Sequence, residues 1–139
     1  MNPDGSPTTD GPYGPPVGDD QVLYRCIAHP HWWDDQEQRI TSVAFKFPCF
    51  SVDVASLAGS PEATLARFRP GTGLVVFPCR TAKELGCDVR LEPDPNHPQN
   101  PAHAHVYVPA ERRKAVARKL VAASTVVRLP SFGPASASS

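Results

Sequence analysis

Short runs in which apolar and polar residues alternate recur along the chain, and each such run predicts a β-strand. The clearest run spans 102–108, where alanine and valine alternate with two histidines and a tyrosine. Further strands are expected at 21–28, 40–47, 50–54, 74–79, 87–92 and 125–129. The runs on either side of Pro48 are expected to pair as a hairpin.

Helical signals are confined to three segments. Ser60 is expected to cap a helix that begins at Pro61 and ends near Phe68. A single turn is expected at 81–85, and the strongest helix at 110–122. Strands and helices alternate irregularly, which predicts an α+β domain with a mixed, mostly antiparallel sheet and helices mainly on one face. The last strand–helix–strand unit could supply one parallel pair.

Both ends of the chain are poor in apolar side chains. Residues 1–20 are rich in Pro, Gly, Asp and Ser, and such a segment cannot bury enough surface to offset its ordering entropy. We therefore expect a disordered tail at 1–20, an α+β domain at 21–130 and a flexible tail at 131–139. A length of 139 residues leaves room for one domain.

Composition restricts the classes of function. The chain has 14 basic and 14 acidic side chains, and this zero net charge argues against a dedicated nucleic-acid binder. No apolar run approaches the roughly 20 residues of a membrane span, and the first residues lack the basic and apolar regions of a secretory signal. We therefore expect a cytoplasmic protein outside the membrane. The four cysteines are expected to be reduced and buried as small apolar groups.

The strand at 102–108 carries the candidate chemistry. Because side chains alternate across a strand, His103, His105 and Tyr107 share the face opposite the alanines and valines. The two imidazoles could act as general acid and base, could bind a divalent transition metal, or could belong to a half-exposed polar sheet face. No other cofactor is indicated.

Other strands supply polar residues that a single sheet could gather on the same face. Ser51 and Asp53 alternate with apolar residues, and Arg25 interrupts the apolar alternation of the first strand. In this arrangement Asp53 would orient a histidine and Arg25 would hold an anionic group. The face would then form a pocket for a ligand that carries a phosphate or a carboxylate.

Loops and the last helix add further candidates. Trp32 and Trp33 could form a lid or a partner-binding edge, or one of them could cap the core. Arg113 falls near the middle of the apolar arc of its helix, so it either extends past the core edge or reaches into a pocket to meet an anion. The loop at 93–101 could close over the histidine strand with Asp94, His97 and Asn100.

Several segments together resemble a family of small uncharacterised bacterial proteins. The shared elements are an LYR strand, an SxAF strand, an SVD strand and an NPAHA junction, and they cover about residues 22–129. This resemblance implies no activity. A more distant likeness matches Tyr24–Arg25 and Ser42 or Ser51 to two elements of mono-ADP-ribosyltransferase cores. The third element, a glutamate on a later strand, has no clear match, since the late candidates Glu92 and Glu111 both depart from the pattern.

Two functional hypotheses follow. The first is a small cytoplasmic bacterial binding or adaptor domain that contacts a protein partner through the tryptophan loop. The second is an enzyme that acts on a phosphorylated or nucleotide-like substrate such as NAD. In the second, Arg25 holds the anion, His103 or His105 transfers a proton, and Tyr107 is an auxiliary donor. The sequence does not decide between a binding protein and an enzyme.

Overall fold

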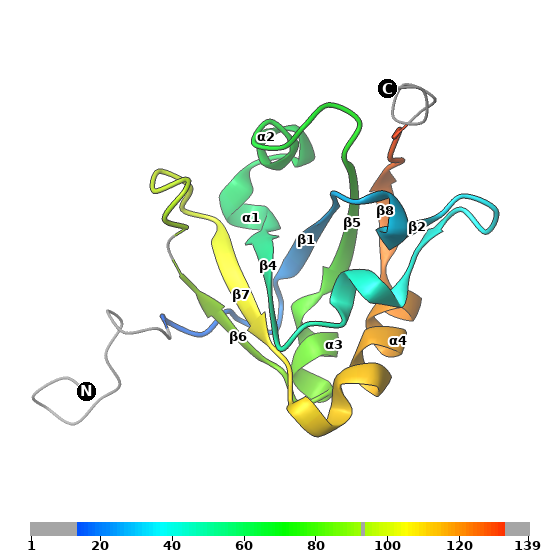
Figure 1. Ribbon diagram of the computed structural model, residues 1–139. Helices are drawn as coiled ribbons and strands as arrows, with labels where there is room; N and C mark the ends of the chain where they lie inside the picture. The colour runs from blue at the N-terminus through cyan, green and yellow to red at the C-terminus, as the bar shows by residue number, and fades with distance from the viewer. Residues whose placement is uncertain (1–13, 93, 133–139) are drawn as a thin grey trace, which may run out of the picture.

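A six-stranded sheet with the strand order β6-β7-β4-β1-β5-β8 forms the centre of the molecule (Figure 1). The computed structural model describes residues 14–92 and 94–132. The strands are β1 (Val22–Ile27), β4 (Cys49–Val54), β5 (Gly73–Pro78), β6 (Asp88–Leu91), β7 (His103–Tyr107) and β8 (Thr125–Arg128). All of these neighbours pair antiparallel, so the α+β class is confirmed. The expected parallel pair is wrong, because three strands separate β7 from β8.

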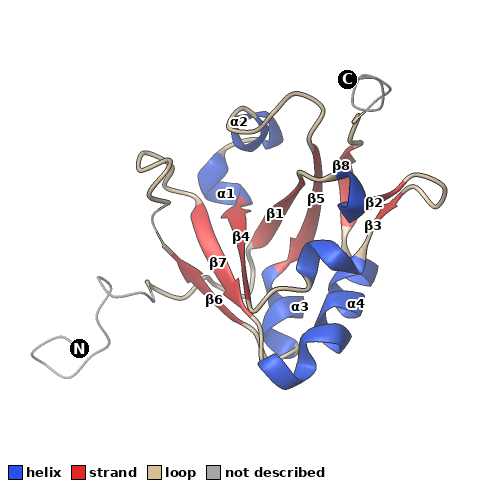
Figure 2. Cartoon of the chain, in the orientation of Figure 1, coloured by secondary structure: helices blue, strands red, loops and turns tan. Residues whose placement is uncertain are grey.

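Helices lie near both ends of the sheet (Figure 2). The helices α3 (Cys79–Glu84) and α4 (Arg113–Ala123) lie together at one end, and α1 (Ala55–Ala58) and α2 (Pro61–Leu65) lie at the other. The remaining elements are the 3-10 turns η1 (Pro30–Trp32), η2 (Ser42–Phe45) and η3 (Ala110–Arg112), and the small hairpin of β2 (Trp33–Asp34) and β3 (Arg39–Ile40). No helix among the described residues is long and apolar enough to cross a membrane.

The hydrophobic core lies between one sheet face and α3 and α4. Leu23 and Ile27 of β1 are completely buried there, as are Val116 and Leu120 of α4. The alternation of apolar residues in the strands therefore sends one set of side chains into the core and leaves the other set on the opposite sheet face.

The segment at 40–47 is not the predicted strand. Its centre forms η2, and β4 pairs with β1 and β7 instead of completing a hairpin with this segment. The consecutive residues Ala44 and Phe45 are both fully buried. A strand would send consecutive side chains to opposite faces, whereas a 3-10 turn can bury both on one side.

The folded part of the chain begins before residue 21 and continues past 130. Residues 14–17 run beside β6, where Leu91 N donates to Pro15 O and Val17 N donates to Val89 O, both at 2.9 Å. A Cβ atom at Gly14 would lie 1.7 Å from the backbone oxygen of Leu91, so this close approach requires glycine. The tails expected at 1–20 and 131–139 are therefore too long as predicted. Their outer parts, 1–13 and 133–139, lie outside the described residues.

Candidate functional site

The pairing of β4 with β7 gathers polar side chains on the sheet face opposite the core. Val54 N donates to Ala102 O and Val108 N donates to Pro48 O, each at 2.8 Å. In an antiparallel ladder, hydrogen-bonded and non-hydrogen-bonded residue pairs alternate, so every second pair between these two bonds is non-hydrogen-bonded. The Cα atoms of such pairs lie about 4.5 Å apart, and their side chains are close. The pairs at these positions are Asp53 with His103, Ser51 with His105 and Cys49 with Tyr107. The predicted gathering of these strand residues is confirmed.

Arg25 does not join this face, and its predicted place there is wrong. Tyr24 is the residue of β1 that pairs with Asp53, so the side chain of Arg25 projects to the opposite, core side. The guanidinium donates to Ala44 O through Nε at 3.1 Å and through a terminal nitrogen at 2.8 Å. Its other terminal nitrogen donates to Ser51 O at 3.0 Å. Arg25 borders the cavity described below, but all three nitrogens of its guanidinium donate to backbone oxygens.

The surroundings of Arg25 are aromatic. The guanidinium carbon lies 4.6 Å from the ring centre of Trp32 and 5.0 Å from that of Phe50. Burial lowers the pKa of Arg25 to about 10, because the charged form is removed from water. The β1–β4 ladder is only two residue pairs long. Arg25 donates a hydrogen bond to Ser51 O of β4, just past the last of these pairs, and so adds a link between the two strands. We therefore assign Arg25 a structural role.

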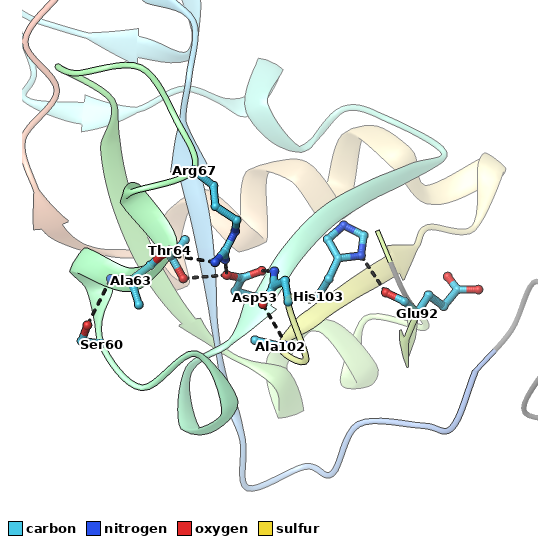
Figure 3. Close-up of polar contacts among 9 residues, drawn as sticks. Asp53, Ser60, Ala63, Thr64, Arg67, Glu92, Ala102 and His103 are labelled. Carbon is cyan, nitrogen blue, oxygen red and sulfur yellow. Dashed lines mark hydrogen bonds and ion pairs between the residues drawn. The ribbon is translucent and has the colours of Figure 1, made fainter. Parts of the chain in front are cut away.

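Asp53 is buried and is held by three side chains (Figure 3). Its carboxylate accepts hydrogen bonds from Thr64 Oγ1 at 2.6 Å and from Asn100 Nδ2 at 3.1 Å, and it forms an ion pair with Arg67. Thr64 belongs to α2, which Ser60 caps by accepting from Ala63 N at 3.1 Å. Asp53 therefore connects α2, through Thr64, and the loop after residue 93, through Asn100, to the sheet. It does not orient a histidine, contrary to the prediction.

His103 is buried beside Asp53, and one hydrogen bond fixes its tautomer. Its Nδ1 lies 2.7 Å from the backbone oxygen of Glu92, which can only accept. Nδ1 therefore carries the proton, and Nε2 of the neutral ring is a hydrogen-bond acceptor. In Figure 3 the ring nitrogen that is not bonded to Glu92 points away from that residue.

The carboxylate that contacts a histidine belongs to Glu92. Glu92 Oε1 lies 2.7 Å from Nδ1 of His105 and also accepts from the hydroxyl of Tyr107. Glu92 is only 8% exposed, so these contacts replace the water that its carboxylate would otherwise bind. The arrangement fixes the ring orientation of His105, in the way predicted for Asp53.

A cavity of about 360 Å³ opens beside Asp53 and His103. The loop residues Asp94, His97 and Asn100 border it, so this part of the loop lies beside the polar face. Ser51 also borders it, whereas His105 and Tyr107 do not. Its aromatic walls are Trp32 and Phe68, and its other polar wall residues include Tyr24, His29, Thr64, Arg67 and Asn96.

The cysteines are not activated nucleophiles. Cys26 borders the cavity, but burial and the nearby charge of Asp53 raise its pKa to about 12. Burial also raises the pKa of Cys87, to about 11. All four thiols are free, and three are buried, as expected for reduced cysteines. A cytoplasmic location fits this thiol content but stays a prediction.

The remaining candidates differ in their relation to the cavity, since Trp32 borders it and Trp33 and Arg113 do not. Trp32 is 9% exposed, with its ring against Arg25, so it is not a surface anchor for a partner. Trp33 is half-buried in the β2–β3 hairpin. Arg113 begins α4 and does not border the cavity. Its Nε is buried without a hydrogen-bond partner in the described part of the chain.

Sequence reasoning missed Arg67 and Thr64 as site residues and gave Glu92 no role beside the histidines. Thr64 and Arg67 are three residues apart, a spacing that places them on one side of a helical turn and could have indicated a shared polar contact. Among residues 14–92 and 94–132, no group of three or more His, Cys, Asp or Glu side chains could hold a metal ion.

Comparison with known proteins adds no functional assignment. The chain matches no family model, no curated protein and no solved structure.

Proposed function

We propose that this domain binds a small, polar, ring-containing ligand of the nucleoside or nucleotide type in the cavity over the polar sheet face. The observation that carries the proposal is the buried ring of His103, which borders a cavity with aromatic walls and whose Nδ1 bond to Glu92 O leaves Nε2 for a ligand. A cavity of about 360 Å³ lies within the usual size range of small-molecule sites.

The lining suits such a ligand for three reasons. Trp32 and Phe68 offer aromatic surface to a flat heterocycle. His103 accepts from an N–H or O–H group, and the exposed Ser51 offers a hydroxyl group. Arg67 retains 23% exposure of its side chain while paired with Asp53, so part of the guanidinium is open to an anionic group.

We propose binding in preference to catalysis. The enzymatic hypothesis requires an arginine, two histidines and a tyrosine around one ligand. Arg25 donates to backbone oxygens, and His105 and Tyr107 contact Glu92 outside the cavity wall. The groups of that mechanism therefore do not surround one substrate position.

Calorimetric titration with the common ribonucleosides and their 5′-monophosphates tests the proposal. His103→Asn keeps an amide N–H near the position of Nδ1, so it can still donate to Glu92 O, but it removes Nε2. We expect this variant to lose roughly tenfold in affinity for the ligand that binds, since one hydrogen bond is lost. His31→Asn, at an exposed histidine outside the cavity wall, is the matched control. Absence of binding by every compound, or equal affinity of the two variants, would overturn the proposal.

A second candidate function is contact with a protein partner, and the edge strand β8 favours it. Val127 is 42% exposed and the following Leu129 is 58% exposed. An edge strand with exposed apolar side chains offers backbone and side-chain groups to another chain. Val127→Lys together with Leu129→Lys should abolish binding of a partner identified by co-purification. Unchanged binding would exclude this surface.

A further inference from the structure

Two further hollows adjoin the cavity. One neighbouring hollow of about 460 Å³ shares Asn96, His97 and Asn100 with it. A second hollow, also of about 460 Å³, shares Ala28, His29 and Phe68 with it. Arg67 borders all three spaces. The three spaces therefore adjoin around Arg67, and we call them together the Arg67 groove.

The Arg67 groove is larger than a site for one small molecule requires. Small-molecule sites usually occupy about 300–1,000 Å³, and the central cavity alone falls within that range. Two further hollows, each as large as the cavity or larger, leave room for additional units on either side of a ligand bound at His103. An extended ligand built from repeated units fits this shape.

The charge of the two outer hollows favours an anionic chain, whereas the central cavity also borders Asp94 and Asp53, which is paired with Arg67. None of the described residues that border the two outer hollows is acidic. The hollow beyond His29 contains Arg69, which is exposed and has no hydrogen bond or ion pair from its side chain to any described residue. Arg67 lies at the junction, two residues before it. An unpaired guanidinium next to a partly open one suits successive phosphates.

The same hollow offers aromatic surface, and the other offers amides. Phe68 is 43% exposed, and Phe132 borders the same space. An exposed ring beside a cation is the combination on which unpaired bases stack. On the other side, Asn96 and Gln99 offer amide groups that can donate to and accept from base edges.

We propose that the Arg67 groove binds a short single-stranded oligonucleotide, with one base in the cavity at His103 and the backbone running past Arg67 to Arg69. This proposal rests on the proposed function and extends it, because it requires the cavity to accept a nucleotide. The groove, rather than the net charge of the chain, supplies the affinity, so binding is expected to be short-range and limited to a few nucleotides.

Competition against a fluorescent tetranucleotide, followed by anisotropy, tests the proposal with the full chain. The competitors are a mononucleotide, a dinucleotide, a tetranucleotide and an octanucleotide of one base, as RNA and as DNA, together with a glutamate decapeptide. We expect affinity to rise by about tenfold or more from mononucleotide to tetranucleotide and then to level off. Added salt should weaken tetranucleotide binding more than mononucleotide binding.

Arg69→Gln should lower the affinity for the tetranucleotide severalfold and leave mononucleotide affinity unchanged. Arg80→Gln, at an exposed arginine of α3 outside the groove, is the matched control and should change neither. Equal affinity for mononucleotide and tetranucleotide would overturn the groove while leaving the cavity proposal intact. Binding of the acidic peptide as tightly as the tetranucleotide would also overturn it, because the groove would then be a general anionic-chain site. Absence of all nucleotide binding would overturn both proposals.

Discussion

The hydrogen bond from Thr64 to Asp53 allows a direct test of what holds the site together. Thr64→Val keeps the shape of the side chain and removes only the donor. The wild-type bond is 2.6 Å long and lies in the interior, with Thr64 2% and Asp53 5% exposed. A hydrogen bond to a charged group contributes about 1.5–3 kcal/mol, so the free energy of unfolding should fall by about that amount.

Urea unfolding at pH 7, analysed by linear extrapolation, measures this loss. Thr72→Val is the matched control, since Thr72 is 8% exposed and its side chain makes no hydrogen bond to the described residues. Its unfolding free energy should change by about 0.5 kcal/mol or less. A double-mutant cycle with Asp53→Asn should give a coupling of about 1–2 kcal/mol. Equal losses in the two threonine variants, or no coupling, would refute the role assigned to Asp53.

Further predictions concern other parts of the fold. Arg25→Met should lower the unfolding free energy by about 2–3 kcal/mol in urea titration, because two backbone oxygens lose their donor. Ser60→Ala should cost about 1 kcal/mol in the same assay through loss of the α2 cap. Gly14→Ala should speed amide exchange in β6, because its Cβ would meet a backbone oxygen there. Cys26 and Cys87 have pKa values raised from 9.0 to about 12 and about 11, so the folded state keeps protons that the unfolded state loses. Their contribution to the free energy of unfolding is therefore full below pH 9 and declines as the pH rises towards 11 and 12. Denaturant titrations at a series of pH values should show this decline. The decline should be weaker in a variant that has alanine at both positions.

The strands of the sheet were predictable from sequence because their apolar alternation reflects burial on one face. The same pattern correctly placed His103 and His105 on a common polar face. Strict alternation puts Arg25 on the same face as Leu23 and Ile27, and the prediction that its charge turns it to the polar face is wrong. The true orientation depends on oxygens of Ala44 and Ser51, which approach Arg25 only after the chain has folded.

The partners in the site were harder to predict than its location. Glu92 reaches His105 and Tyr107 across a strand pair, and no local spacing marks that contact. Asp53 and His103 are direct neighbours in register, yet the carboxylate contacts Thr64 and Arg67 instead. A strand register can be derived from periodicity, but the choice among nearby donors depends on how α2 packs above the sheet.

The strand order has a consequence for how the chain acquires its structure during synthesis. Among the described strands of the six-stranded sheet, only β6 and β7 are neighbours joined by a single loop, and every other pair of neighbours has further elements between its two strands. The segment at 14–17, although made early, has no partner until β6 has been synthesised. Loop-closure entropy must therefore be overcome repeatedly, which predicts folding in milliseconds to seconds. The apolar face of β1 lacks the cover of α4 until residue 123 has been synthesised, so the preceding stage is the one most exposed to aggregation.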